Sequence, residues 1–203
     1  MTHTTPWQQR LATGTEDIQG EVIRWYQESR YGKAFVPTMV WGTLQTEAYA
    51  TAVLRKVVEF LGVPDDVPAG VAKRMERQQV LYDGEHRYDV VLGEQGLYTN
   101  IGGASVMREQ MERLLRDFGL PSLNLGILPS TAEVSVIPEP AFSIFETDEG
   151  RRVDYELVSR GVDITEPSEV ALHDRAFDAI SAGARYGDAA RELISKALDH
   201  WSR

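Results

Sequence analysis

The sequence contains no cysteine, which excludes disulfide bonds, thiolate nucleophiles and cysteine-ligated metal sites. No run of apolar residues approaches the roughly 18 that a membrane-spanning helix needs. The first residues also lack the basic and apolar segments of a secretory signal peptide. With 42% hydrophobic and 26% charged residues, the 203-residue chain has the composition of a soluble globular protein. We therefore expect a cytoplasmic protein with a single domain over residues 1–203.

Positive charge is scarce as well. The 21 Lys and Arg residues are outnumbered by 31 Asp and Glu residues, so the net charge is −10. Binding to nucleic acid depends on clustered Lys and Arg that neutralise phosphates, whereas the basic residues here are interleaved with acidic ones. We expect no direct contact with nucleic acid and no membrane partner.

The usual motifs for metals and cofactors are also missing. No two of the histidines, which are His3, His86, His173 and His200, have a ligand spacing supported by a nearby carboxylate motif. The pair Gly102-Gly103 falls short of both the Rossmann and the P-loop patterns. We expect no metal site and no cofactor.

Apolar periodicity predicts helices over about 16–29, 46–61, 68–81 and 106–118, with two more starting near 168 and 188. Alternation predicts strands near 88–92, 123–128, 142–146 and 153–158, with a hairpin turn at Thr147-Asp-Glu-Gly150. Residues 31–42 are punctuated by Gly32, Pro37 and Gly42 and are expected to form a loop.

These elements predict an α+β fold, a single domain in which a small mixed or antiparallel sheet of about four strands packs with about six helices. The N-terminal helical layer would span about 16–82, the sheet and central helix about 88–158, and the C-terminal helices about 168–202. In the last predicted strand, Tyr155 and Glu156 point to opposite faces, so at most one of them should line any one cavity.

Glu94 is the main candidate for chemistry, because it directly follows the apolar run Tyr88–Leu92. Burial beside aromatic residues would raise the pKa of its carboxyl and let it shuttle protons near neutral pH. The alternative is an ion pair with Arg74, Arg77 or Arg108 that ties the strand to a helix.

Two further features favour the binding of a small molecule. Arg74 and Arg77 lie three residues apart on one helical face, a geometry that suits a carboxylate but also suits structural ion pairs. Aromatic residues gather in the first quarter of the chain, among them Trp41 and Tyr49, and could wall a site for a flat ligand or simply fill the core.

A set of ordered motifs resembles a known family. The motifs are Trp41-Gly-Thr-Leu-Gln-Thr-Glu-Ala-Tyr-Ala50, Arg74-Met-Glu-Arg-Gln78, Val91-Leu-Gly-Glu94, Val106-Met-Arg-Glu-Gln-Met-Glu-Arg-Leu-Leu115 and Gly126-Ile-Leu-Pro129. Over roughly residues 16–201 the chain resembles the domain of unknown function that follows the helix-turn-helix in XRE-type actinomycete regulators. That resemblance implies a domain that senses a ligand or a partner.

The sequence departs from this family in two respects. Only some fifteen residues precede the domain, so we expect a stand-alone protein without the DNA-reading helices. The family's Pro-Gly-Leu-Leu-Gln-Thr is replaced by Trp41-Gly-Thr-Leu-Gln-Thr46, which includes Gln45 and suggests a cavity with a changed lining.

A weaker resemblance, to cofactor-free Pictet–Spengler cyclases, implies roles for individual residues. Glu94 would transfer protons, helped by His86, and Arg74 or Arg77 would hold a substrate carboxylate. Further substrate contacts would come from four residues: Trp41, Gln45, Tyr49 and Arg108.

Two functions follow as hypotheses. The first is a biosynthetic enzyme that condenses and cyclises an aromatic amine or amino acid with an aldehyde. The second is a ligand-sensing or protein-interaction domain that has lost its helix-turn-helix, and that works through a small partner protein or a separate DNA-binding chain. The exposed parts of the two terminal helices could also form a homodimer.

Overall fold

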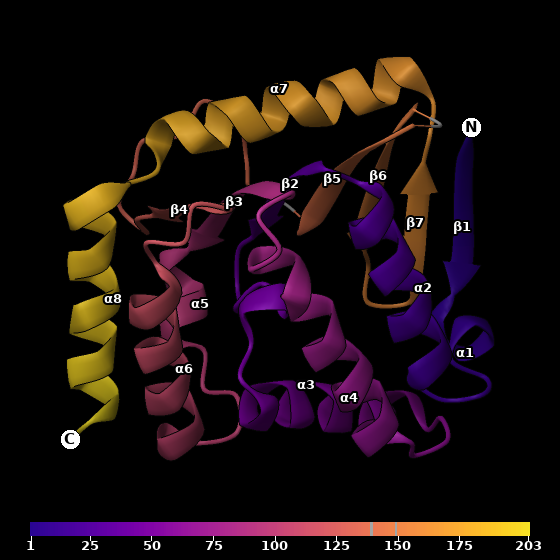
Figure 1. The fold of residues 1–203 in the computed structure, drawn as a ribbon, viewed down its shortest axis with the longest axis horizontal. Coiled ribbons are helices and arrows are strands. Elements are labelled where there is room, and N and C mark those ends of the chain that lie inside the picture. Colours follow the sequence, from indigo (N-terminus) through magenta and orange to yellow (C-terminus); the bar gives the residue numbers. More distant parts are fainter. Residues whose placement is uncertain (139, 149) are drawn as a thin grey trace.

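The computed structural model describes residues 1–138, 140–148 and 150–203, and in these residues the chain forms eight α-helices and seven strands (Figure 1). The elements in chain order are β1 Thr2–Pro6, α1 Trp7–Arg10, α2 Glu16–Glu28, β2 Tyr31–Val36, the 3-10 helix η1 Gly42–Leu44, α3 Glu47–Leu61, α4 Val67–Arg77, the 3-10 helix η2 Gln78–Leu81, β3 Arg87–Gly93, α5 Glu94–Tyr98, α6 Ala104–Asp117, β4 Leu123–Leu128, β5 Phe142–Thr147, β6 Gly150–Glu156, β7 Arg160–Ile164, α7 Pro167–Gly183 and α8 Gly187–Trp201.

All seven strands form one mixed sheet in the order β1-β7-β6-β5-β2-β3-β4. Strands β2, β3 and β4 are parallel, and the other neighbours are antiparallel. The α+β class and the mixed sheet are therefore confirmed, and the four predicted strands correspond to β3, β4, β5 and β6. Glu149 of the predicted hairpin turn lies outside the described residues, although its flanking residues Thr147 and Gly150 are partners in the β5–β6 register.

The expectation of about four strands was too low, and the predicted loop over 31–42 was wrong in its first half. Tyr31–Val36 is the strand β2, which lies between β5 and β3. Gly32 does not break this strand. A Cβ at Gly32 would come within 3.1 Å of the Tyr88 ring, so the glycine allows that ring to pack on the backbone. The edge strand β1 was also missed, because it is mostly exposed and lacks an apolar alternation. Its neighbour β7 was missed as well.

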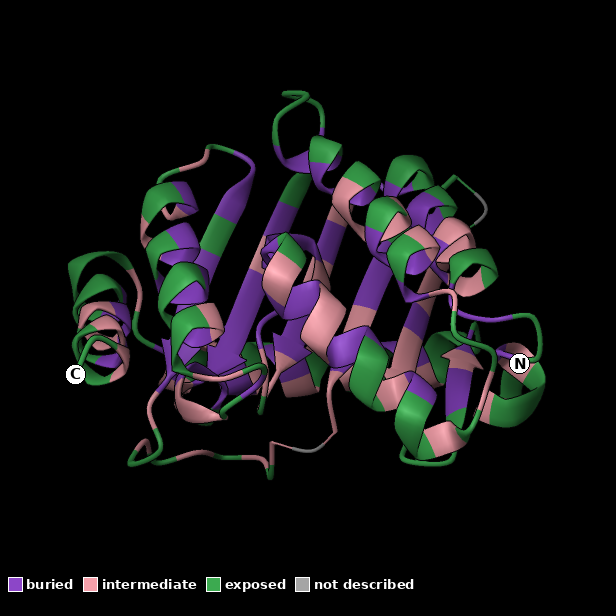
Figure 2. Cartoon of the chain, turned by 90° about the horizontal axis from the view of Figure 1, so that it is seen from below, coloured by how far each residue is buried: buried purple, intermediate pink, exposed green. Residues whose placement is uncertain are grey.

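The two faces of the sheet are covered unequally (Figures 1 and 2). Helix α7 crosses one face, where its Val170, Phe177 and Ile180 pack in a cluster with Ile144 and Val153 of the sheet. The other face packs against α2, α3, α6 and α8 in the larger apolar cluster. A small third cluster joins α3 to α4. The six longer helices agree with the prediction, whereas the short helices α1 and α5 were not predicted.

Capping residues fix the start and end of α3 as expected. The Thr46 hydroxyl accepts a hydrogen bond from the Tyr49 backbone N–H at 3.2 Å, and Gly62 ends the helix in the left-handed conformation with φ of 65°. This placement matters for the site, since the loop before α3 carries Trp41 and Gln45. None of the helices in the described residues is both long and apolar enough to cross a membrane.

Candidate functional site

A cavity of about 580 Å³ lies between the larger helical layer and the edge of the sheet where β6 ends and β5 begins. Helix α2, the loop before α3, helix α4 and strand β6 each contribute part of its wall. The lining is mainly apolar and aromatic, with the side chains of Arg74, Arg77 and Asp154 among its few charged groups. Small-molecule sites are typically apolar cavities of roughly 300–1,000 Å³ with a few convergent polar groups.

Arg77 is the most unusual group in this cavity. Its side chain is buried, with 5% of the residue exposed, and its guanidinium lies 5.1 Å from the Tyr26 ring centroid. Among the described residues, no carboxylate forms an ion pair with Arg77 and no group hydrogen-bonds its Nε. Burial lowers the pKa of Arg77, because the charged form is poorly solvated, and Glu156 opposes the shift only in part.

Gly42 makes room for this guanidinium. A Cβ at Gly42 would come within 2.5 Å of Arg77 Nη2, closer than non-bonded atoms approach. The Trp41-Gly-Thr stretch that departs from the family pattern therefore lies directly against the buried charge.

Arg74 occupies the next turn of α4 and is held by amides rather than by acids. Its Nε donates to Gln19 Oε1 at 3.1 Å, and its Nη1 donates to Gln45 Oε1 at 2.7 Å. Gln45 is fixed in turn, because its Nε2 donates to the Val40 carbonyl at 2.7 Å. Burial, together with the nearby charge of Arg77, lowers the pKa of Arg74 to about 9. With a pKa of about 9, Arg74 keeps its charge at neutral pH, and neither Arg74 nor Arg77 forms an ion pair with a carboxylate of the described chain.

Asp154 faces the cavity from β6. Its Oδ1 is buried and has no hydrogen-bond partner among the described residues, and the closest cationic group in an ion pair with it, Arg10 Nη1, is 3.9 Å away. Burial, reinforced by the charges of Glu156 and Asp163, raises the pKa of Asp154 to about 8. At pH 7 this carboxyl is mostly protonated.

Aromatic residues form the floor between these polar groups. Trp41 Nε1 donates to the Tyr26 hydroxyl at 2.9 Å, and the two ring centroids lie 5.8 Å apart. Tyr88 packs on the Trp41 ring at 5.4 Å and supports it from the sheet. These contacts hold Tyr26 and Trp41 in fixed positions along the cavity wall.

Four of the residues predicted for substrate binding thus line one cavity. They are Trp41, Gln45, Arg74 and Arg77. Tyr49 lies behind this wall: it is fully buried, and its hydroxyl accepts a hydrogen bond from the Val40 backbone N–H at 3.2 Å. Arg108 is on the exposed surface of α6, where it pairs with Glu112 at 3.9 Å, so the structure does not bring it to the cavity.

The two residues predicted to transfer protons lie elsewhere. Glu94 begins α5, and its Oε2 accepts hydrogen bonds from the Ser130 backbone N–H at 2.7 Å and from the Ser130 hydroxyl at 2.9 Å. This contact ties the carboxyl end of β3 to the residues after β4. Glu94 is not part of the cavity wall, and within the described chain it forms no ion pair with Arg74, Arg77 or Arg108.

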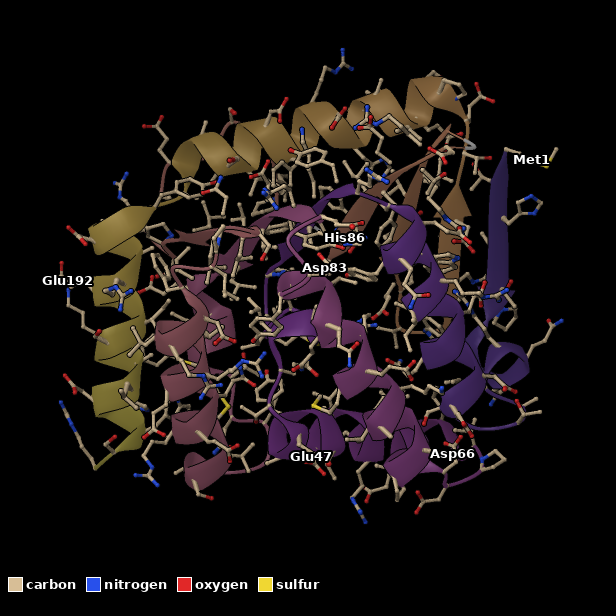
Figure 3. All side chains as sticks on the ribbon, in the orientation of Figure 1. Met1, Glu47, Asp66, Asp83, His86 and Glu192 are labelled. Atoms are coloured by element: carbon tan, nitrogen blue, oxygen red, sulfur yellow. The ribbon has the colours of Figure 1, made fainter. Side chains whose placement is uncertain are left out.

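His86 precedes β3, whereas Glu94 follows it, so at roughly 3.3 Å per residue about 25 Å of strand separates them. The His86 ring lies beside Asp83 (Figure 3), with 2.6 Å between its Nδ1 and Asp83 Oδ2. The ring also stacks on Tyr88. The structure therefore does not bring His86 and Glu94 together, and a proton relay between them does not fit this geometry.

Asp154 was missed as a site residue, whereas Tyr26 belongs to the N-terminal aromatic cluster that the sequence offered as a possible wall. Asp154 is a polar member of the alternation that begins at Val153, and a single strand does not reveal which of its faces meets a cavity. The expectation that Tyr155 and Glu156 could not line the same cavity was wrong. Both border it, because β6 ends there and the cavity reaches around the sheet edge. In the described chain, no group of three or more His, Asp or Glu side chains is placed to hold a metal ion.

Comparison with known proteins places the sequence in a family. Residues 21–196 match the family described as Domain of unknown function (DUF5753), which confirms the resemblance drawn from the ordered motifs. No curated protein matches the sequence. The solved structure of TrmBL2, described as an archaeal chromatin protein with a novel mode of DNA binding, is similar with a TM-score of 0.39 and 9% identity, over 92% of this chain and 55% of that one. The weaker resemblance to cyclases stays a prediction.

Proposed function

We propose that this chain, which belongs to the DUF5753 family, binds a small organic carboxylate with an apolar body and serves as a ligand-sensing domain. The observation that carries the proposal is the buried Arg77, which lines a cavity and has no ion pair with a described residue. A lone buried charge costs several kcal/mol, and an anionic partner that arrives from outside would offset this cost.

A carboxylate is the anion that this arrangement suits. The guanidinium of Arg77 offers a planar fork of N–H donors, and Arg74 adds a second positive charge one turn away. The two arginines repel each other, as the lowered pKa of Arg74 reflects, so a negative charge between them would relieve that repulsion. Charge-assisted hydrogen bonds of this kind contribute about 1.5–3 kcal/mol each.

The remaining wall suits an apolar and preferably aromatic body. Trp25, Tyr26 and Trp41 border the cavity with apolar residues of α2 and α3. At the cavity mouth Phe60 is 74% exposed and Val158 is 82% exposed, so apolar surface is also available at the entrance. Binding of a flat apolar group would cover this surface and gain about 25 cal/mol for each Å² removed from water.

The direct test is a thermal-shift screen of aromatic carboxylates, each paired with its uncharged primary amide. At 100 times its Kd, a ligand of the folded state stabilises it by about 2.7 kcal/mol. We expect carboxylates, but not their amides, to raise the Tm, and we expect Arg77→Met to abolish the effect. Arg55→Met, an exposed position on the same helical layer, is the matched control. Equal shifts with acid and amide, or an unchanged response in Arg77→Met, would overturn the proposal.

A second candidate is the condensation and cyclisation of an aromatic amine or amino acid with an aldehyde. Asp154 favours it, because a carboxyl with a pKa of about 8 in an apolar cavity can both give and take a proton near neutral pH. The amine and aldehyde would lose one water and take up one proton from the Asp154 carboxyl to form an iminium, a ring carbon would attack it, and the ring would return one proton to the Asp154 carboxylate. Asp154 would take the role predicted for Glu94.

Mass spectrometry distinguishes the two candidates. An enzyme consumes both reactants and yields a product equal to their sum minus one water, at a rate above that of the uncatalysed mixture. In that case Asp154→Asn should lower the rate strongly while carboxylate binding persists. Ligands that stabilise the protein and are recovered unchanged from every amine–aldehyde mixture would exclude this reaction and support the sensing function.

A further inference from the structure

The cavity has a second polar group that a bound carboxylate would leave unused. Asp154 lies on the β6 wall, whereas Arg74 and Arg77 come from α4. The Asp154 side chain is 18% exposed, and its buried Oδ1 lacks a hydrogen bond in the described chain. A buried acceptor without a donor costs about 1–3 kcal/mol, so this wall favours a ligand that brings a donor.

The cations beside Asp154 are committed to other acids. Arg10 is 3.5 Å from Glu21 and only 3.9 Å from Asp154, the second a distance too long for a hydrogen bond. Arg152 donates to Asp163 at 2.6 Å. Neither arginine therefore hydrogen-bonds the Asp154 carboxyl, and Asp154 is one of the residues that line the cavity.

We propose that Asp154 receives a protonated amine of the ligand, so that the cavity takes an amphoteric molecule. The carboxylate end would meet Arg77, the ammonium end would meet Asp154, and the apolar body would pack on Tyr26 and Trp41. This inference rests on the proposed function for the carboxylate end. The ligand class is then an amino acid with a large apolar side chain, or a short apolar peptide of similar size.

The ionisation of Asp154 provides an independent signature. The groups that act on it are Arg10 of α1, Tyr26 of α2, Arg152 and Glu156 of β6, and Asp163 of β7. In the empty cavity burial keeps the carboxyl mostly protonated at pH 7, since its pKa is raised to about 8. An arriving ammonium would displace that proton, so binding should release up to about one proton per ligand.

The experiment is calorimetric titration of the intact chain with four probes. L-Tryptophan is compared with indole-3-propionate, which lacks the amine, and the dipeptide Trp-Phe is compared with its N-acetylated form. We expect removal of the amine to weaken binding by about tenfold or more in the wild-type protein, the factor that corresponds to roughly 1.4 kcal/mol. In Asp154→Asn the difference should shrink below about threefold, whereas Asp199→Asn, an exposed change on α8, should preserve it.

Titrations in two buffers of different ionisation enthalpy count the protons released and require no variant. Release with the amine-bearing probe, and none with its partner that lacks a free amine, would support the inference. Equal affinities of the probes with and without an amine would overturn it and leave the carboxylate site standing. If none of the four probes bound to the wild-type protein, the inference and the proposed function would both fail.

Discussion

Arg113 of α6 and Arg77 of α4 are both buried on the same side of the sheet, but their surroundings differ completely. Arg113 pairs with Asp117, donates to Gln78 Oε1 at 3.0 Å and donates to the Tyr82 hydroxyl at 3.1 Å. Arg77 has no ion pair with any described residue and lines a cavity. The first arginine joins α6 to the end of α4. The second leaves its charge available, which is why we assign it to a ligand.

The largest effect should follow from breaking the satisfied network. Arg113→Ala would leave the buried Asp117 carboxylate without its main cation, and removal of one partner from a buried pair costs about 3–5 kcal/mol. Urea unfolding measures this loss. A change below about 1 kcal/mol would mean that the two arginines are not as different as their contacts indicate.

Arg77→Met should have the opposite sign in the absence of ligand. Replacing an unpaired buried charge by an apolar side chain of similar size removes a desolvation cost, and replacement of whole buried ion pairs by apolar residues is often neutral or stabilising by about 1–4 kcal/mol. We expect the gain in unfolding free energy to lie near the low end of that range, because the contact of Arg77 with the Tyr26 ring is lost as well. Urea unfolding beside Arg55→Met provides the measurement, and marked destabilisation would show that Arg77 is structural.

Asp154→Asn should change how stability depends on pH. The raised pKa means that the folded protein keeps a proton that the unfolded chain releases above about pH 4. This group therefore makes wild-type stability fall as pH rises from about 4 to about 8, with no further loss above that. The variant should lack the component and exceed the wild type by about 1–2 kcal/mol at pH 8.5, within the range for a buried polar group without a partner.

Unfolding curves at several pH values test this prediction. The matched variant Asp199→Asn should follow the wild-type pH profile. An Asp154→Asn profile parallel to that of the wild type would show that the carboxyl is solvated or already paired.

Glu94→Gln should have the smallest effect. Its Oε2 accepts two hydrogen bonds from Ser130, and a neutral amide oxygen can accept both more weakly. We expect a loss of about 0.5–1.5 kcal/mol and unchanged affinity for carboxylates. The proton-transfer role predicted for Glu94 from sequence would instead require this substitution to abolish turnover with folding intact. Observation of that outcome would restore Glu94 as a candidate and weaken the case for Asp154.

The contrast between the arginines also shows what the sequence could reveal. The helices α2, α3 and α6 were predictable because each repeats apolar residues along one face, and the ends of α3 carry a Thr cap and a Gly stop. Strand β2 was not predictable, because Gly32 reads in the sequence as a strand breaker. In the folded sheet this glycine instead permits a close contact with the Tyr88 ring.

The same limit applies to the site. Arg74 and Arg77 were found because two cations three residues apart on a helix must share a face. Their lack of a partner could not be read from sequence, since Arg113 is equally basic and fully paired. Asp154 was missed because its role depends on which side of β6 faces α2. Glu94 drew attention through its position after β3, yet Ser130, distant in sequence, satisfies it.

A crystal structure of the protein soaked with an aromatic amino acid or Trp-Phe tests the central claim most directly. The account predicts the ligand carboxylate at about 3 Å from the guanidinium nitrogens of Arg77, in the cavity between α2, α4 and β6. It also predicts that Arg77 has no protein carboxylate as a partner when the cavity is empty. A crystal structure in which Glu156 or another acid of the chain pairs with Arg77, with the ligand absent or bound elsewhere, would contradict it.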